Sequence, residues 1–212
     1  MNLQRQAVPR IARKFQRTQQ IVATAPNKRQ SEILPEHHKK IYNVENIFDA
    51  ENRQYIIEES EKYAQTHQWK TRRHRNYPTT DNDIKNISSI NSMVVNTVQE
   101  KLLPEFYKHY NVSVNIIEIF IAKYTVDGQS SLELHRDGSD FSFVIALNKE
   151  FEGGGTFFKD LDQTFKPDAG NAIIFSGRQF HSGVKITEGT RYILTGFLRR
   201  DVFSGLNKIL KK

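Results

Sequence analysis

The spacing of apolar residues changes along the chain from a helical period to a strand-like alternation. From Asn43 to His67, apolar residues recur every three or four positions with charges between them, which predicts an amphipathic helix on the outside of a sheet. The same period from Ile84 to Tyr110 predicts a second helix, which must kink or break near Pro104. Its apolar stripe consists of Ile87, Ile90, Val94, Val98, Leu102 and Phe106. Residues 32–43 are expected to form a linker.

From Asn115 onward, short apolar or alternating runs are separated by turns that contain glycine. They predict strands at residues 115–125, 131–136, 141–148, 155–159, 163–166, 171–175, 180–186 and 190–199. The turns are expected at Asp127-Gly128, Gly153-Gly154-Gly155, Ala169-Gly170 and Glu188-Gly189. The expected fold class is therefore mainly β with supporting α-helices, a jelly-roll core preceded by two or three helices.

Length and charge divide the chain into an arm and a domain. The 212 residues leave room for one domain with a good core and an appendage. Residues 1–31 contain seven Lys and Arg and no Asp or Glu, so the net charge of +7 belongs to this part of the chain. We predict a basic, flexible arm at 1–34 and a domain at 35–212, with its helical front at 43–110 and its jelly-roll core at 115–200.

The arm has an apolar stripe of its own. Val8, Ile11 and Phe15 lie at helical spacing among basic residues, which favours a short amphipathic helix over residues 8–19. A solvated, disordered tail, contact with nucleic acid or an anionic surface, and a mitochondrial transit peptide all fit this composition.

Several absences in the sequence bear on location. The chain has no cysteine, no apolar run of about 20 residues that could cross a membrane, and no apolar secretory signal at its start. We expect a soluble protein that is not secreted and works in a reducing compartment, cytoplasmic or nuclear, with a mitochondrial location as the alternative. The oligomeric state is not predicted.

Candidate metal ligands lie in the predicted strands. Side chains alternate along a strand, so His135 and Asp137 project to the same face. If a neighbouring strand brings His181 to the same point, two imidazoles and one carboxylate can bind a metal and leave positions open, as in non-heme Fe(II) oxygenases. Arg191 follows in a β-rich run, where a guanidinium would be costly to bury without an anionic partner.

The order His135-x-Asp137, His181, Arg191 resembles that of the 2-oxoglutarate and Fe(II)-dependent dioxygenases, in particular their prolyl and lysyl hydroxylase branch. The resemblance covers roughly residues 110–200. It implies a double-stranded β-helix, Fe(II) held by the His-Asp-His set, O2 and 2-oxoglutarate as cosubstrates, and ascorbate as a further candidate cofactor. Arg191 would bind the distal carboxylate of 2-oxoglutarate, and its identity favours the lysyl hydroxylase-like or oxygen-sensing prolyl hydroxylase-like members.

Two other residues are candidates for binding 2-oxoglutarate. Tyr124 ends the strand before the metal loop and could donate its hydroxyl to the carboxylate, as a Tyr does in similar hydroxylases, or it could be an ordinary core tyrosine. Thr195 shares a strand face with Arg191, where a small polar residue could also serve only for packing.

The stretch from Trp69 to Asp83 is rich in cations and aromatic residues. The candidate substrate contacts are Arg72, Arg73, Arg75 and Tyr77 in this stretch and Arg178 in the turn before His181. A loop held by Trp69 and Tyr77, with its cations in solvent, is the alternative.

The predicted function is hydroxylation of a prolyl or lysyl side chain of a protein, with decarboxylation of 2-oxoglutarate to succinate. An oxygenase or demethylase acting on nucleic acid is the first alternative, favoured by the basic arm and the arginine cluster. A jelly-roll binding module without turnover is the second.

Overall fold

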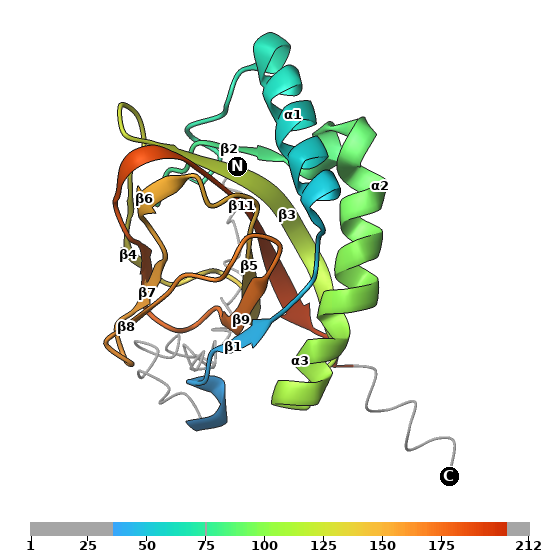
Figure 1. The fold of residues 1–212 in the computed structure, drawn as a ribbon. Coiled ribbons are helices and arrows are strands. Elements are labelled where there is room, and N and C mark those ends of the chain that lie inside the picture. Colours follow the sequence, from blue (N-terminus) through green and yellow to red (C-terminus); the bar gives the residue numbers. More distant parts are fainter. Residues whose placement is uncertain (1–35, 75, 203–212) are drawn as a thin grey trace, which may run out of the picture. The chain divides into compact units, whose positions relative to one another are not determined.

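The computed structural model describes residues 36–74 and 76–202, in which a helical front is followed by a β-rich core (Figure 1). The basic arm and the helix predicted over residues 8–19 lie outside the described residues, as does Arg75. The division into an arm and a domain stays a prediction.

The helical front differs from the predicted one at its start. Its elements are the 3-10 turns η1 (Glu36–His38) and η2 (Ile84–Asn86), the helices α1 (Ala50–His67), α2 (Ser88–Thr97) and α3 (Leu103–Tyr110), and the π-helical turn η3 (Val98–Leu102). The first helix was expected to begin at Asn43, which is wrong. Asp49 caps α1 by accepting a hydrogen bond from the backbone N–H of Asn52 at 2.8 Å. Within the linker predicted over residues 32–43, the described part contains the 3-10 turn η1, and its last two residues belong to the strand Tyr42–Val44.

The second predicted helix is confirmed together with its irregularity. It runs from Ser88 to Tyr110 through α2, η3 and α3. The π-helical turn at Val98–Leu102 comes just before Pro104, which has no N–H to donate to the preceding turn. All six residues of the predicted apolar stripe are buried.

The strands follow the predicted pattern with three additions. They are β1 (Tyr42–Val44), β2 (Asp81–Asp83), β3 (Val114–Thr125), β4 (Leu132–His135), β5 (Phe141–Ala146), β6 (Phe151–Gly153), β7 (Thr156–Phe158), β8 (Gln163–Phe165), β9 (Ala172–Ser176), β10 (His181–Gly183) and β11 (Ile186–Arg200). The sequence did not predict β1, β2 and β6. Asp-Asn-Asp in β2 has little intrinsic preference for a strand and is ordered by pairing with β3.

The turn predicted at Glu188-Gly189 is wrong. β11 continues through these residues and pairs with β6 there. Gly189 has a φ of +74°, and the register shifts between Ile186 and Glu188. Glycine therefore accommodates an irregularity inside a long strand at this point and does not end the strand.

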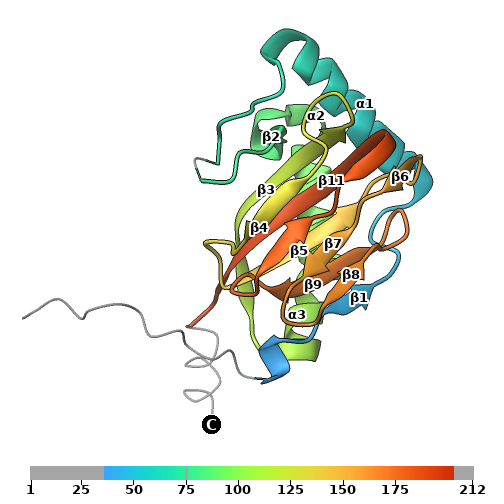
Figure 2. The same ribbon diagram turned by 90° about the vertical axis from the view of Figure 1, so that its left-hand side faces the viewer.

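Two sheets form the jelly roll. The larger sheet has the order β1-β9-β5-β11-β3-β2, with β6 joined to β11, and the smaller has the order β4-β10-β7-β8. Figure 2 shows the smaller sheet in front of the larger one, with α1 and α2 behind both. The double-stranded β-helix expected from the resemblance is thus the observed core.

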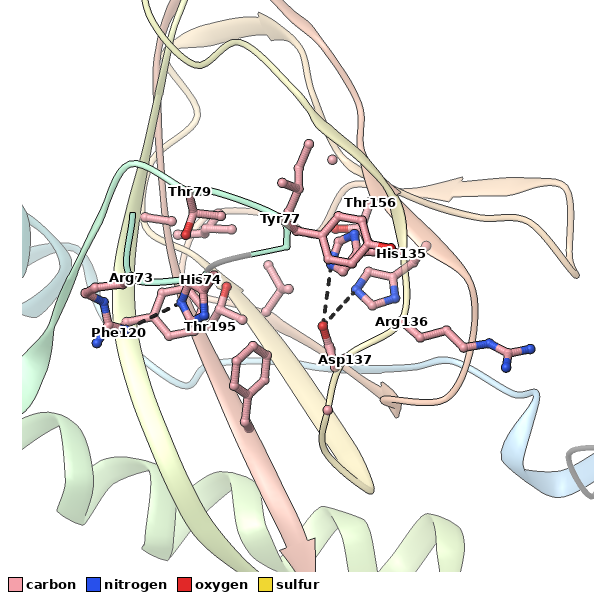
Figure 3. A pocket seen from close by; sticks show the side chains of 18 of the residues that line it. Arg73, His74, Tyr77, Thr79, Phe120, His135, Arg136, Asp137, Thr156 and Thr195 are labelled. Atoms are coloured by element: carbon pink, nitrogen blue, oxygen red, sulfur yellow. Dashed lines mark hydrogen bonds and ion pairs between the residues drawn. The ribbon is translucent and has the colours of Figure 1, made fainter. Parts of the chain in front are cut away.

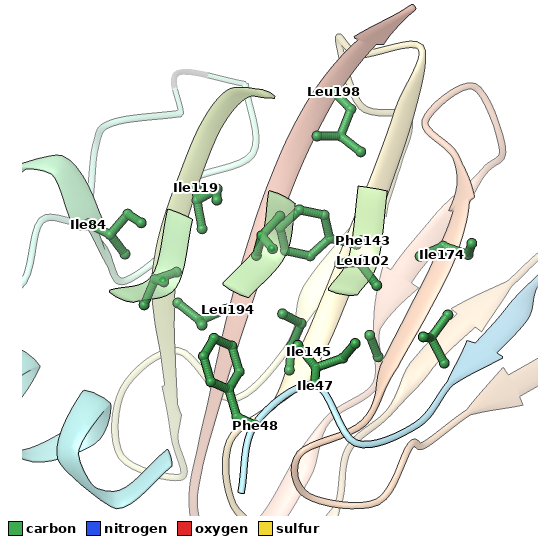
Figure 4. Packing of buried hydrophobic residues seen from close by; sticks show 14 of the residues in the cluster. Ile47, Phe48, Ile84, Leu102, Ile119, Phe143, Ile145, Ile174, Leu194 and Leu198 are labelled. Atoms are coloured by element: carbon green, nitrogen blue, oxygen red, sulfur yellow. The ribbon is translucent and has the colours of Figure 1, made fainter. Parts of the chain in front are cut away.

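Alternation along the strands gives the large sheet two different faces. Ile119 and Leu194 face the helices and belong to the same buried cluster as Leu102 (Figure 4). The neighbouring Tyr124 and Ile193 belong to a second apolar cluster, which lies on the side of the smaller sheet. The helices therefore support the sheet from behind and leave its other face to the site.

No helix in the described part of the chain is both long and apolar enough to cross a membrane.

Candidate active site

His135, Asp137 and His181 lie together where β4 pairs with β10. His135 ends β4 and His181 begins β10, and the two are direct partners in the antiparallel register. Asp137 Oδ1 lies 3.5 Å from the Nε2 atom of each histidine. One potential ligand atom from each residue falls within 4.8 Å of the other two (Figure 3). The three side chains predicted from the sequence therefore converge on one point.

The hydrogen bonds around the three side chains prepare them for a metal. His135 Nδ1 lies 2.7 Å from the Glu133 carbonyl oxygen, and His181 Nδ1 lies 2.9 Å from that of Gln179. A carbonyl only accepts, so each Nδ1 carries the proton and each Nε2 presents a lone pair. Two imidazole nitrogens and a carboxylate oxygen with open positions form a donor set that fits Fe(II).

The pKa shifts differ between the two histidines. Burial acts to lower the pKa of His135, but its hydrogen bonds with Asp137 and the Glu133 carbonyl outweigh it, so the net shift is upward. Burial lowers the pKa of His181, which favours a neutral imidazole. Burial acts to raise the pKa of Asp137, but the hydrogen bond with His135 and the charge of His181 outweigh it, so the net shift is downward. Ser142, 0% exposed, also donates to Asp137 Oδ2. Asp137 is thus held as a carboxylate with Oδ1 directed at the histidines.

Arg191 is a buried cation for which the described part of the chain supplies no counterion. It lies on β11, is 3% exposed, and pairs with none of the described carboxylates. Its Nη1 atom has no hydrogen-bond partner, and burial lowers its pKa. A guanidinium in this state is costly unless an anion joins it, and a carboxylate is the group whose geometry it matches. The site thus fits a ligand with a distal carboxylate, such as 2-oxoglutarate.

A cavity of about 460 Å³ connects the metal ligands with Arg191. Tyr124 and Thr195, the two further residues predicted to bind 2-oxoglutarate, both line it. Burial raises the pKa of Tyr124, so its hydroxyl stays protonated and can donate. Val144, Phe175 and Ile193 supply apolar wall between these polar groups.

The predicted substrate residues separate into two groups. Arg73 and Tyr77 line the cavity, whereas Arg72 and Arg178 are exposed and do not. Arg178 lies 3.9 Å from Asp140. Arg75 is outside the described residues. A role for Arg72, Arg75 or Arg178 in substrate binding stays a prediction.

Arg73 is not a solvated cation. It forms ion pairs with Asp81, Asp83 and Glu118, and its guanidinium carbon lies 5.5 Å from the centre of the Phe120 ring. These contacts fix Arg73 as a wall of the cavity on the side of β2 and β3 (Figure 3).

Sequence reasoning did not single out Ser142 or Thr156, although Ser142 holds a metal ligand and Thr156 lines the cavity. His74 also lines the cavity, beside Phe120 and Phe197. The position of Ser142 in β5 could be read from strand alternation, but its bond to Asp137 depends on how the metal loop folds back.

Known proteins share this combination of fold and site residues. Residues 119–199 match the family model described as the 2OG-Fe(II) oxygenase superfamily, where 2OG is 2-oxoglutarate. Multifunctional procollagen lysine hydroxylase and glycosyltransferase LH3 of Rattus norvegicus is 30% identical over 160 residues, which are 68% of this chain and 21% of that protein. Its counterpart in Caenorhabditis elegans is 40% identical over 110 residues, 49% of this chain and 15% of that protein. The chain thus spans about a fifth or less of these relatives.

Solved structures show the same fold. The viral collagen prolyl hydroxylase vCPH from Paramecium Bursaria Chlorella virus-1, in its 2OG complex, is similar with a TM-score of 0.57 and 18% identity, covering 76% of this chain and 96% of that chain. A Pseudomonas putida prolyl-4-hydroxylase is similar with a TM-score of 0.51 and 15% identity, covering 76% and 92%. Residues 119–199 form a domain of the 2OG-Fe(II) oxygenase superfamily, and the sequence relatives of the chain include procollagen lysine hydroxylases.

Proposed function

We propose that this chain is a 2-oxoglutarate and Fe(II)-dependent hydroxylase of protein side chains, with a lysyl residue as the first substrate to test and a prolyl residue as the second. The observation that carries the proposal is the convergence of His135, Asp137 and His181 at one end of a cavity that has the uncompensated Arg191 deeper inside it. A diacid with one metal-chelating end and one free carboxylate suits both ends of this cavity.

When bound, the metal and 2-oxoglutarate supply the oxidising chemistry, in which O2, the C–H bond and 2-oxoglutarate yield C–OH, succinate and CO2. The chain's own residues supply binding and orientation. The two Nε2 atoms and Asp137 Oδ1 would hold the metal. Arg191 holds the distal carboxylate, and the protonated Tyr124 can donate a second hydrogen bond to it.

The remaining walls of the cavity control access. Phe175 and Ile193 exclude water from the inner part, which strengthens the hydrogen bonds made there. Asn76, Arg136 and Gly138 line the cavity and are exposed, and the half-buried Arg73 and Tyr77 lie beside Asn76 in the chain, so a substrate side chain would enter on this side. Their fixed positions give the entrance a defined shape.

The preference for lysine rests on the relatives. The sequence matches of 30% and 40% identity are to proteins named as procollagen lysine hydroxylases, whereas the prolyl hydroxylases match in fold at 18% and 15% identity. A reducing compartment remains our proposal for the location, and a procollagen substrate is not part of the proposal.

The test is turnover of defined substrates by the full chain with Fe(II), 2-oxoglutarate and ascorbate. Lysyl and prolyl peptides and an oligonucleotide are compared by mass spectrometry, and succinate is measured in parallel. Oxygen added to a peptide in step with succinate supports the proposal. Oxygen added to the oligonucleotide alone would place the substrate in the nucleic-acid class. Metal and 2-oxoglutarate binding without turnover of any substrate would favour a binding module.

A further inference from the structure

Gln129 links the loop between β3 and β4 to the covering segment, the name used here for residues 69–80, which contribute Arg73, His74, Asn76, Tyr77 and Thr79 to the cavity wall. It lies in the loop between β3 and β4, and its carbonyl oxygen accepts a hydrogen bond from the Thr125 N–H at 3.0 Å. This bond closes a turn at the end of β3. The side chain of Gln129 is therefore presented from a fixed backbone.

Both the oxygen and the nitrogen of the Gln129 side-chain amide form hydrogen bonds. Its Oε1 accepts from the backbone N–H of Thr80, and its Nε2 donates to the carbonyl oxygens of Pro78 at 3.1 Å and Ser131 at 3.3 Å. Three backbone groups from two segments are thus joined by one side chain. Asn or Glu could not replace it, since Asn is shorter by one methylene and Glu has no N–H to donate.

The residue next to Pro78 is Tyr77, which lies against a metal ligand. The Tyr77 ring centre is 4.9 Å from that of His135, with 34° between the ring planes (Figure 3). Tyr77 is half-buried and lines the cavity. Its ring therefore forms part of the entrance directly above His135.

Other anchors of this segment lie on either side of Tyr77. Arg73 is tied to the carboxylates of Asp81, Asp83 and Glu118, and the Thr80 carbonyl accepts from the Lys123 N–H at 2.8 Å. Among the described residues 76–78, the hydrogen bond from Gln129 to Pro78 is the one that holds the backbone. The place of Tyr77 is therefore set mainly by Gln129.

We propose that Gln129 is a positioning residue that acts through Tyr77, fixing the ring against His135 so that the substrate side chain is directed to the metal. The proposal rests on the hydroxylase function proposed above. Gln129 touches neither the three metal ligands nor Arg191, so its loss leaves the binding of metal and 2-oxoglutarate intact. Loss of Gln129 weakens peptide binding and increases the fraction of turnovers in which 2-oxoglutarate is consumed without hydroxylation of the peptide.

The first test compares Gln129→Ala, which removes all three hydrogen bonds, with Gln129→Glu, which keeps the acceptor and loses the donor. Both are expected to raise the peptide KM by about fivefold or more, the size of effect that loss of a hydrogen bond gives. Both also raise the ratio of succinate to hydroxylated peptide, while KM for 2-oxoglutarate is unchanged. Gln65→Ala is the control, because Gln65 is exposed on α1 and its side chain makes no hydrogen bond to the described residues.

A double-mutant cycle separates action through Tyr77 from a general weakening of the loop. If Gln129 acts through Tyr77, then adding Gln129→Ala to Tyr77→Ala changes the succinate ratio no further. Additive effects of the two substitutions would overturn the proposal. So would wild-type values in both Gln129 variants when the wild-type chain is active.

Limited proteolysis tests the anchoring by Gln129 without depending on enzymatic turnover. The covering segment contains Arg72 and Arg73, so trypsin cleavage between Trp69 and Pro78 reports how firmly it is held. Gln129→Ala and Gln129→Glu are expected to be cut there faster than wild type and Gln65→Ala, at unchanged melting temperature. Equal cleavage rates would overturn the proposed anchoring. If the wild-type chain forms no succinate, the proposed hydroxylase function fails. A difference in cleavage rate between the Gln129 variants and wild type would then still support the anchoring by Gln129.

Discussion

Arg191 lies directly opposite Tyr124 in the antiparallel pairing of β11 with β3, and its guanidinium carbon is 5.4 Å from the centre of the tyrosine ring. Both side chains are 3% exposed. The Arg191 Nη1 atom has no hydrogen-bond partner among the described residues. A buried cation and a buried donor side by side form a pocket that is completed by an anion.

Arg191→Met should stabilise the free protein and at the same time abolish its stabilisation by 2-oxoglutarate. The free protein should gain stability, because a buried guanidinium with no counterion is replaced by an apolar chain of similar length. The rise in melting temperature that 2-oxoglutarate produces in the Mn(II)-loaded protein should be lost, since an ionic hydrogen bond contributes about 1.5–3 kcal/mol. Thermal unfolding with and without 2-oxoglutarate measures both effects. A variant that is still stabilised by 2-oxoglutarate would contradict the assignment of Arg191.

Ser142→Ala should weaken metal binding without removing a ligand. The hydroxyl of Ser142 donates to Asp137 Oδ2, and its loss leaves that buried oxygen without this donor. Removing such an outer partner typically lowers metal affinity by about 10- to 100-fold. Titration of the metal-free protein with Mn(II) measures the change. Ser113→Ala serves as the control, since the Ser113 side chain makes no hydrogen bond to the described residues, and equal affinities in both variants would exclude a role for Ser142.

The sequence predicted the site better than its surroundings. His135 and Asp137 share a strand face by simple alternation, and the order of His181 and Arg191 along the chain matched a known pattern. The ion pairs of Arg73 could not be predicted, because they depend on the pairing of β2 with β3, and the sequence of β2 has little strand preference. The contact of Gln129 with Pro78 likewise joins segments 51 positions apart.

The fold, too, was predicted correctly in some parts and wrongly in others. Periodic apolar spacing was sufficient to predict the second helix, and Pro104 predicted its irregular turn. Local patterns failed at β1, where three residues are ordered only by pairing with β9, and at Gly189, where a glycine inside a strand resembled a turn. Both errors arise where tertiary pairing overrides local preference.

Gly196→Ala should destabilise the fold by about 1–3 kcal/mol, the usual cost of overpacking. Gly196 lies in β11 between β3 and β5, and a Cβ atom there would meet the Phe143 ring at 2.2 Å. Gly138→Ala is the matched control, because nothing lies within 4 Å of a Cβ at that position. Urea unfolding of the two variants compares them. Equal free energies of unfolding would show that the ring of Phe143 can move aside.

Glu61 should contribute stability that depends on pH. Its carboxylate lies 2.7 Å from Lys123 Nζ and accepts hydrogen bonds from Tyr192 and, at 3.3 Å, from Trp69. Burial acts to raise the pKa of Glu61, but the hydrogen bonds from Lys123 and Tyr192 outweigh it and lower the pKa. A folded-state pKa below that of the unfolded chain means that the contribution is full at neutral pH and is lost as the pH falls through the folded-state pKa.

Glu61→Gln should therefore be less stable than wild type by about 1 kcal/mol at neutral pH, a value discounted for partial exposure. The difference should shrink as the pH is lowered below about 5, towards the ordinary glutamate range. Urea unfolding at several pH values measures it, with the exposed Glu45→Gln as the control. A difference that grows on acidification would reverse the sign of the argument.

The central claim is that His135, Asp137 and His181 bind one Fe(II) together with 2-oxoglutarate. Anaerobic titration of the metal-free protein with Fe(II) and 2-oxoglutarate tests it through the visible charge-transfer band of the chelated ketoacid. We expect a band that saturates at stoichiometric metal in the wild-type chain and is absent in His135→Ala. No band in a folded wild-type protein, or an undiminished band in His135→Ala, would contradict the assignment of the site.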